Sequence, residues 1–260
     1  MQQPPGFTHP DKPHHVCRLR KSIYGLKQVP RAWYHTLRKF LCDYGCVNSK
    51  SDSSLFILQH HGTILYILVY VDDIIVTGNS NAKVNECITK LANTFSIKDM
   101  GKLHYFLGVE VIPTSTSLFL SQHKYIADLI ERTKMMDSKP VLTPLSTSVT
   151  LTKDDGSPTT DITFYRSIIG SLQYLSMTRP DIAFSVNKLA QFMQRPNTTH
   201  LTTLKRVLRY LKGTIFHGLL LQKPTTSTLI AYSDAGWAGN KDDYTSTSAH
   251  LVYFDSNLIS

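Results

Sequence analysis

The first half of the chain alternates between two patterns of apolar residues. Stretches with apolar side chains at every third or fourth position predict helices, and they are residues 30–44, 82–95 and 123–135. Runs rich in β-branched and aromatic residues predict strands, and they are residues 54–59, 64–71, 74–78 and a pair on either side of a turn at 113–117. The mixture predicts an α+β fold.

The pattern changes from residue 140 onward. Residues 140–163 are rich in Ser, Thr, Pro and Asp and have little periodic apolar content, so we expect a linker there, at 146–163. Helical spacing then returns in three stretches, which are 164–177, 181–194 and 199–212. After them, "LIAYSDAGW" and "SAHLVYF" predict two strands of a further sheet.

One arc of the helix expected at 199–212 is basic. Leucines and a valine form an apolar stripe along it, and Gly213 follows as its expected C-cap. The opposite arc carries Lys205, Arg206, Arg209 and Lys212. A solvated helix face is one interpretation of this arc, and a surface that contacts nucleic acid is the other.

Composition adds a surplus of positive charge. The chain has 28 Lys and Arg against 19 Asp and Glu, a net charge of +9, which indicates a polyanionic partner, most commonly nucleic acid, although many basic proteins are ordinary enzymes. The four cysteines lack zinc-site spacing, so we expect free thiols in a reducing compartment. The N-terminus has no signal segment and no apolar run is long enough to cross a membrane, so we expect an intracellular protein, cytoplasmic or nuclear.

The apolar run "ILVYVDDIIV" contains two adjacent aspartates, Asp72 and Asp73. A hairpin turn that only reverses the chain favours Asn-Gly or Asp-Gly, whereas this tip is expected to be Asp72-Asp73. Two like charges this close repel unless a cation lies between them. A solvent-exposed turn that discourages edge aggregation is the alternative. Two hard carboxylates on a hairpin tip suit the two magnesium ions of phosphoryl-transfer enzymes.

The residues around this pair carry a family resemblance. The matching motifs, in chain order, are "QPPGF" (3–7), "KSIYGLKQVPRAWY" (21–34), "SDSSLF" (51–56), "YVDDIIVTG" (70–78), "YFLGVEV" (105–111), "LSQHKYI" (120–126), "KPVLTPL" (139–145), "YRSIIGSLQYLSMTRPDIAFSVNKLAQFM" (165–193), "LKRVLRYLKGT" (204–214) and "YSDAGWAG" (232–239). They resemble the Pol polyprotein of copia-type LTR retrotransposons, from the reverse transcriptase into the start of ribonuclease H. They cover nearly the whole chain in the family's order.

The resemblance implies a fold and a division of the chain. The fold would be α+β, with a reverse transcriptase palm and thumb, a helical connection and an incomplete ribonuclease H-like start. Residues 1–145 would be a partial reverse transcriptase, 146–163 a linker, 164–225 a thumb or connection segment and 226–260 the truncated ribonuclease H-like start. The function implied is that of a fragment of an RNA-directed DNA polymerase.

The resemblance also implies site residues. Asp72 and Asp73 would be catalytic and would bind Mg²⁺, with Tyr70 and Val71 against the primer terminus and template. Gly25, Lys27, Gln28 and Arg31 would line the incoming deoxynucleotide, and Gly108 would lie in the primer grip. An RNA template, a DNA primer and a dNTP are the implied partners, with no membrane and an unassigned oligomeric state.

Local residues agree with a nucleic-acid surface near residue 30. Basic groups between residues 18 and 39 lie among aromatic residues, as phosphate contact and base stacking require; they are Arg18, Arg20, Lys21, Lys27, Arg31, Arg38 and Lys39, with Tyr24, Trp33 and Tyr34. The helical spacing of Trp33 with Leu37 favours a place in the core for Trp33.

Asp234 resembles the first metal ligand of ribonuclease H. In this sequence Gly236 replaces an acidic residue of the family's motif, and Asp242, Asp243 and Asp255 match no ligand motif and are expected to be loop charges. We therefore expect no ribonuclease activity.

The family's other palm aspartate lies upstream of "QPPGF", so we expect the isolated chain to be catalytically inactive, a truncated remnant that at most binds nucleic acid. A retained binding module is the third hypothesis.

Overall fold

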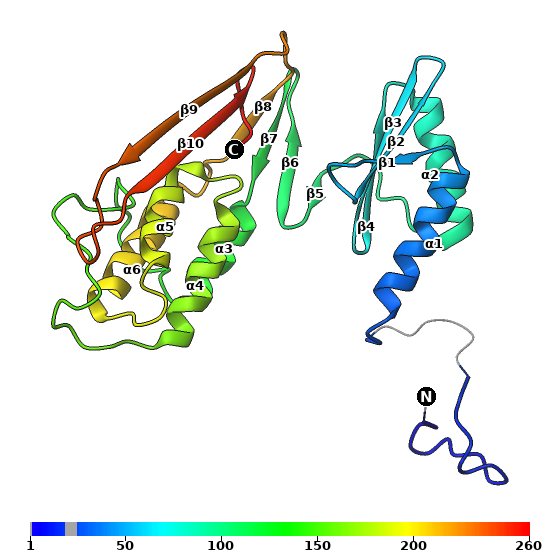
Figure 1. Ribbon diagram of the computed structural model, residues 1–260, viewed down its shortest axis with the longest axis horizontal. Coiled ribbons are helices and arrows are strands. Elements are labelled where there is room, and N and C mark those ends of the chain that lie inside the picture. The colour runs from blue at the N-terminus through cyan, green and yellow to red at the C-terminus, as the bar shows by residue number, and fades with distance from the viewer. Residues whose placement is uncertain (1, 19–24) are drawn as a thin grey trace. The chain divides into compact units, whose positions relative to one another are not determined.

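The computed structural model describes residues 2–18 and 25–260, which form two compact units divided after Gly101 (Figure 1). Each unit has a hydrophobic core of its own. Arg20, Lys21 and Tyr24, which belong to the expected basic and aromatic surface, lie outside the described residues. No helix among the described residues is both long and apolar enough to cross a membrane.

The first unit packs two helices against one sheet. Its elements are α1 (Val29–Asp43), β1 (Val47–Asn48), β2 (Leu55–His60), β3 (Thr63–Tyr70), β4 (Asp73–Gly78) and α2 (Asn81–Phe95). The strands form an antiparallel meander in the order β1-β2-β3-β4. The expected helices and strands of this region are confirmed, and Gly45, with φ of +100°, follows the end of α1.

The core of the first unit follows the alternation of the strands. Leu65, Ile67 and Val69 of β3 are buried, whereas Tyr66 and Tyr70 between and beside them are exposed. The buried face packs in one cluster with leucines of α1 and α2, and Trp33 packs against its edge, as its spacing predicted. Burying a large aliphatic side chain contributes about 1.5–3 kcal/mol, so this face fixes the sheet to its helices.

Cys42, Cys46 and Cys87 are free thiols, as expected. Cys46 and Cys87 are buried in the first core, and burial raises the pKa of Cys46 to about 12 and that of Cys87 to about 11. Both remain protonated at neutral pH and act as small apolar side chains.

The second unit combines two small sheets with a helical bundle. Its elements are β5 (Tyr105–Phe106), β6 (Val109–Pro113), β7 (Ser117–Ser121), α3 (His123–Arg132), α4 (Ile162–Leu175), a 3₁₀-helix (Pro180–Ile182), α5 (Ala183–Ala190), α6 (Thr198–Gly213), β8 (Leu219–Gln222), β9 (Leu229–Gly236), β10 (Thr247–Phe254) and β11 (Asn257–Leu258). One antiparallel sheet has the order β5-β6-β7-β8 and the other β11-β10-β9.

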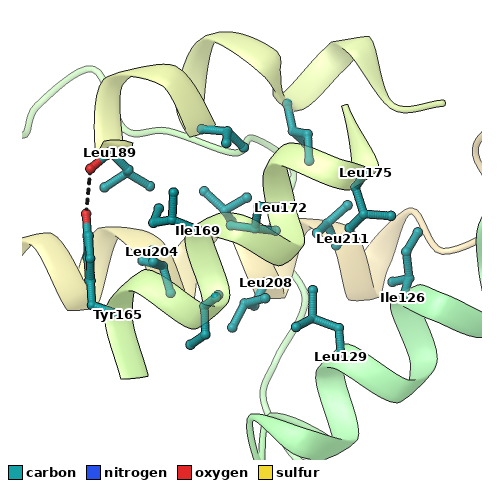
Figure 2. Packing of buried hydrophobic residues seen from close by; sticks show 14 of the residues in the cluster. Ile126, Leu129, Tyr165, Ile169, Leu172, Leu175, Leu189, Leu204, Leu208 and Leu211 are labelled. Carbon is teal, nitrogen blue, oxygen red and sulfur yellow. Dashed lines mark hydrogen bonds between the residues drawn. The ribbon is translucent and has the colours of Figure 1, made fainter. Parts of the chain in front are cut away.

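The bundle core is the larger of the two cores and gathers side chains from α3, α4, α5 and α6 (Figure 2). The apolar stripe of α6 lies inside it, because Leu204, Leu208 and Leu211 are fully buried. Tyr165 of α4 crosses this core and donates a hydrogen bond from Oη to the carbonyl oxygen of Leu189, at 2.9 Å (Figure 2). Desolvation raises the pKa of Tyr165, so its hydroxyl remains a donor.

Two details of the helices differ from expectation. The stretch 181–194 is not one helix, because a 3₁₀ turn precedes α5 and α5 ends at Ala190. Gly213 is not the C-cap of α6 but its last helical residue, and Thr214 is the cap. Proximity explains this glycine, since a Cβ on Gly213 would lie 3.0 Å from Cβ of Pro140.

The segment 146–163 has almost no regular structure, yet hydrogen bonds fasten it to the bundle. Asn197, the N-cap of α6, donates from Nδ2 to Asp155 at 2.7 Å. His200 accepts a hydrogen bond at Nδ1 from the backbone N–H of Asn197, so its Nε2 carries the proton and donates to the carbonyl oxygen of Thr152, at 3.0 Å. The segment is therefore held against the start of α6.

Candidate functional site

The β3–β4 hairpin carries the aspartate pair. Tyr70 lies opposite Asp73 in the register, so Val71 and Asp72 form the two-residue turn and Asp73 begins β4. The expectation that Asp72-Asp73 is the tip was wrong by one residue, because pairing between Tyr70 and Asp73 closes the ladder one step earlier. Asp72 therefore lies in the turn and Asp73 at the start of a strand, so the two carboxylates do not occupy equivalent positions.

Val71 has an unusual backbone conformation. Its φ of +48° lies in the left-handed region, which β-branched residues rarely adopt and which costs about 1–3 kcal/mol. Glycine is the usual residue where a hairpin turn needs positive φ. The tight turn holds this strain because the ladder on both sides of it is complete.

Both carboxylates face solvent. Asp72 and Asp73 are exposed, and neither carboxylate forms a hydrogen bond or ion pair with another described residue. Residues directly opposite on an antiparallel pair point to the same side, so Asp73 shares its face with Tyr70. This is the face that α1 and α2 leave uncovered, since the alternate residues of β3 fill the core.

The uncovered face of the sheet is apolar and leads to the aspartates. Ile57, Leu68 and Ile75 on it are only partly buried, and Tyr66 and Tyr70 are 42% and 51% exposed. Their place on this face follows from the register of β2, β3 and β4. Aromatic and aliphatic surface beside two carboxylates suits a ligand that has both a charged and a stacking part.

The donor set around the pair fits a hard divalent cation. Carboxylate oxygens are the ligands that Mg²⁺ prefers, and such ions are commonly held by one or two carboxylates plus water and substrate phosphates. No group of three or more His, Cys, Asp or Glu that could hold a metal occurs within residues 2–18 and 25–260. Asp72 and Asp73 are thus a two-ligand, open set whose remaining positions would come from a substrate.

The residues expected to line a nucleotide surround the start of α1, in the same unit. Gly25 has φ of +93°, which requires its lack of a side chain. Lys27 and Arg31 are exposed, and Gln28 is the N-cap residue of α1. Arg31 donates from Nε to His35 at 3.5 Å, and no hydrogen bond joins these residues to the β3–β4 turn in the described part of the chain.

Gly108 occupies the turn between β5 and β6. Leu107 and Gly108 both have positive φ, of +48° and +72°, as a type I′ hairpin turn requires. A Cβ on Gly108 would lie 2.8 Å from Oη of Tyr174 on α4. The contact with Tyr174 in the same unit is therefore enough to require glycine at this position.

Asp234, the other candidate metal ligand, lies in β9 of the β9–β10 hairpin. It is exposed, Ala249 is opposite it, and its Oδ1 accepts a hydrogen bond from the N–H of Ala235. Asp242 accepts from the N–H of Lys153, and Asp243 lies 3.8 Å from Nζ of Lys153. The expectation of loop charges holds for both of these residues.

Asp255 is the third expected loop charge. It accepts hydrogen bonds from Thr225 and Thr226, which lower its pKa to about 2. Its carboxylate therefore stabilises the turn between β8 and β9.

Sequence reasoning missed one buried ionic network. The Arg179 side chain is 1% exposed and forms a bidentate pair with Asp181, at 2.9 and 2.7 Å, while it also donates to Thr214. Tyr210 donates to the same carboxylate, at 2.8 Å. Burial opposes ionisation of Asp181, but Arg179 and Tyr210 more than offset it, and the net effect lowers the pKa of Asp181. Only the adjacency of Arg179, Pro180 and Asp181 signals this network in the sequence.

Known proteins resemble this chain over its whole length. The family described as "Reverse transcriptase (RNA-dependent DNA polymerase)" matches residues 1–147. The Retrovirus-related Pol polyprotein from transposon RE1 of Arabidopsis thaliana is 54% identical over 260 residues, which are 100% of this chain and 18% of that protein. The corresponding polyprotein from transposon RE2 of the same plant is 53% identical, again over 100% and 18%.

A more distant plant relative gives the same correspondence. The Retrovirus-related Pol polyprotein from transposon TNT 1-94 of Nicotiana tabacum is 35% identical over 100% of this chain and 20% of its own length. The chain thus spans about a fifth of these relatives, and no solved structure matches it. The exposed aspartate pair of the β3–β4 hairpin falls inside the matched family region, and the chain belongs to the reverse transcriptase family, as part of the reverse transcriptase region of a retrotransposon Pol polyprotein.

Proposed function

We propose that this chain supplies the palm carboxylates of an RNA-directed DNA polymerase that acts by two-metal nucleotidyl transfer. The observation that carries the proposal is the pair Asp72 and Asp73, which is exposed at a strained turn of a hairpin whose other face is buried. Rigid strands hold carboxylate oxygens in place while solvent exposure leaves them open to substrate. Such a mount is what a metal shared with a substrate requires.

The residues of the hairpin have different roles in this proposal. Asp72 and Asp73 hold Mg²⁺, and Tyr70 and Val71 contact the primer terminus and template. The bound ions supply charge neutralisation while the primer 3′-hydroxyl attacks a dNTP and pyrophosphate departs. The strain at Val71 fixes the direction in which the Asp72 side chain leaves the turn.

The remaining candidate residues contact nucleic acid or nucleotide in this proposal. Gly25, Lys27, Gln28 and Arg31 orient the dNTP, and exposure of Lys27 and Arg31 supports contact with its phosphates. Gly108 belongs to the primer grip. The partners are an RNA template, a DNA primer and a dNTP.

The parts of the chain are proposed to correspond to parts of a polymerase. Residues 1–145 form a palm with part of the fingers, 146–163 a linker, 164–225 the thumb or connection segment, and 226–260 a ribonuclease H-like start with Asp234 as its vestigial ligand. The helical bundle supports the thumb assignment, because α4, α5 and α6 share one core. A catalytically inactive remnant is the alternative, and the similarity to known polyproteins does not favour it over this proposal.

Primer extension in a matched chimera tests the proposal. This chain replaces the corresponding residues of the RE1 Pol polyprotein, to which it is 54% identical, and extension of a DNA primer on an RNA template is followed with Mg²⁺. We expect Asp72→Asn/Asp73→Asn to reduce extension by on the order of a hundredfold or more, because charge stabilisation of the transition state is lost.

Asp234→Asn is the matched control, since it removes one carboxylate from the other hairpin and should leave extension unchanged. Equal extension by the double variant and the unmodified chimera would refute the role of the pair. The isolated chain assayed in parallel shows whether it has activity without the rest of the polyprotein.

A further inference from the structure

The strand β9 is the free edge of its sheet. The order of that sheet is β11-β10-β9, so the side of β9 away from β10 has no strand next to it among residues 2–18 and 25–260 (Figure 1). Every residue of β9, from Leu229 to Gly236, is exposed. An edge strand of this length presents backbone N–H and C=O groups with which another strand can pair.

The register identifies the backbone groups that point away from β10. Residues of an antiparallel strand alternate between those that exchange hydrogen bonds with the residue opposite and those whose N–H and C=O groups point to the other side. The N–H of Asp255 donates to the carbonyl oxygen of Thr228, so these two opposite residues form a hydrogen-bonded pair. By alternation, the odd-numbered residues of β9 point their backbone groups to the free edge; they are Leu229, Ala231, Ser233 and Ala235.

Two further contacts agree with this alternation. Val252, which lies opposite Ala231, forms its backbone hydrogen bonds with residues 259–260 on the β11 side. The N–H of Ala235 donates to Oδ1 of Asp234 instead of to a strand. The outward residues that have no strand opposite them within the described ranges are therefore Leu229, Ala231 and Ser233.

The sequence of this edge does not discourage pairing. Natural edge strands are commonly protected by Lys, Pro, a bulge or a short length. Residues 229–236 contain no Lys, Arg or Pro, Asp234 is their single charged residue, and their ladder with β10 is continuous. Ile230 and Tyr232 add exposed apolar surface on one face, which Leu251 of β10 shares. The edge therefore has the properties of a strand that pairs.

We propose that two copies of this chain pair through β9, antiparallel, about a twofold axis at Ala231. The symmetry places Ala231 opposite the same residue of the second copy and Leu229 opposite Ser233 of the second copy. Each outward residue then exchanges its backbone hydrogen bonds across the axis. Ile230 lies opposite Tyr232 of the second copy, and such an aliphatic–aromatic pair adds cross-strand packing on one face.

Charge and backbone both favour this register. With the axis at Ala231, Asp234 lies opposite Thr228 of the second copy, so no like charges meet. An axis one residue further along would place Ile230 opposite Asp234, and an axis two residues further would need the N–H of Ala235, which Asp234 already accepts. The edge is self-complementary under the twofold axis, and this is the reason to assign it to a second copy. The inference concerns the oligomeric state and does not depend on the proposed polymerase function.

Sedimentation equilibrium at several protein concentrations tests the pairing. Two paired edge strands form a smaller contact than a standard interface of about 800 Å² per partner, so we expect half-dimerisation at on the order of 10–100 µM. The net charge of +9 makes the copies repel, and moderate salt screens this repulsion.

Charge reversal at the axis identifies the interface. Ala231→Lys and Ala231→Glu each bring two like charges together, so each should weaken self-association by about tenfold or more. An equimolar mixture of the two variants places opposite charges at the axis and should restore the dimer. Ala249→Lys is the matched control, because it adds the same charge at an exposed position of β10, away from the edge, and should leave dimerisation unchanged.

Hydrogen exchange of the unmodified chain needs no variant and decides the question if the variants fail to fold. Raising the protein concentration should slow exchange of the N–H groups of Leu229, Ala231 and Ser233, measured by NMR. The N–H groups of the even-numbered residues of β9 are already bonded to β10, so their exchange should change less.

Restoration of the dimer by mixing, together with the concentration-dependent protection of the edge, would support the inference. A monomer at every concentration would overturn it, as would a dimer that survives Ala231→Lys. Variants that stay monomeric when mixed would show that β9 does not pair with itself at this register. Exchange at the edge that slows on addition of the RE1 Pol polyprotein, but not with the concentration of the chain, would identify a different occupant and contradict the inference.

Discussion

Two hairpins of this molecule carry aspartates, and they differ in what lies behind them. In the β3–β4 hairpin, alternate residues are buried against two helices, and Asp72 and Asp73 emerge at its turn. In the β9–β10 hairpin every residue of β9 is exposed, and Asp234 lies in mid-strand. Both hairpins are antiparallel with continuous ladders.

The two hairpins therefore differ as candidates for a metal site. The first hairpin has two carboxylates on consecutive residues, a buried face and a turn residue, Val71, with positive φ. The second has one carboxylate, with Ala249 opposite it and loop aspartates that bind Lys153 instead. We therefore propose metal binding at the first hairpin.

The largest expected difference is in local stability. Ile67→Ala empties a fully buried position behind the aspartates and should cost about 2–5 kcal/mol. Ile230→Ala changes a residue of β9 that is 40% exposed and should cost less than about 1 kcal/mol. Hydrogen exchange of peptides from residues 63–78 and 229–254 measures both. Equal loss of protection in the two hairpins would show that the first has no special support.

The two turns differ in strain by a smaller amount. Val71→Gly relieves a β-branched residue at φ of +48°, whereas Ala238→Gly relieves an unbranched residue at +54°. After the entropy that glycine adds to the unfolded chain, we expect a net gain of about 0.5–1 kcal/mol for Val71→Gly and less for Ala238→Gly. Denaturant unfolding measures the gain, and primer extension by the chimera should fall for Val71→Gly only. If Val71→Gly stabilises the chain and primer extension is unchanged, the strain at Val71 has no role in function.

The smallest expected effect is a pH dependence of stability at His200, which holds the segment next to the β9–β10 loop. Burial lowers the pKa of His200 below its ordinary 6.5, against the opposing attraction of Asp155 and Asp242. Folding therefore disfavours the protonated ring, and the stability of the second unit should fall as the pH drops below about 6.5. This loss occurs above the pH range in which the carboxylates protonate.

His200→Gln is the matched variant, because Gln at the third helical position can still complete a capping box with Asn197. Unfolding of the two proteins is compared between about pH 7 and pH 5. The unmodified chain should lose stability across this window and the variant should lose less. Parallel curves would exclude His200 as the source.

Local pattern predicted most elements because their apolar periodicity is strong. The helices at 82–95 and 199–212 and the strands of the β3–β4 hairpin agree with α2, α6, β3 and β4 to within one or two residues. The strand β8 was missed, because its four residues are identified as a strand only by pairing with β7, about 100 residues earlier. No local signal specifies such a distant partner.

The candidate site was predictable in part. Asp72 and Asp73 stand out by charge alone, but the register that makes Val71 a turn residue does not follow from composition. The basic arc of α6 was visible in the helical pattern, whereas the hydrogen bonds that Arg206 and Arg209 donate to residues 136–143 depend on how that segment returns across the helix. Tertiary packing decides both.

The central claim is that Asp72 and Asp73 hold a divalent cation, and Mn²⁺ binding tests it most directly. Electron paramagnetic resonance measures free Mn²⁺ during titration of the chain with primer–template and dNTP present. The account predicts saturable binding that Asp72→Asn/Asp73→Asn abolishes and Asp234→Asn leaves intact. Binding that survives the double variant, or that depends on Asp234 instead, would contradict it.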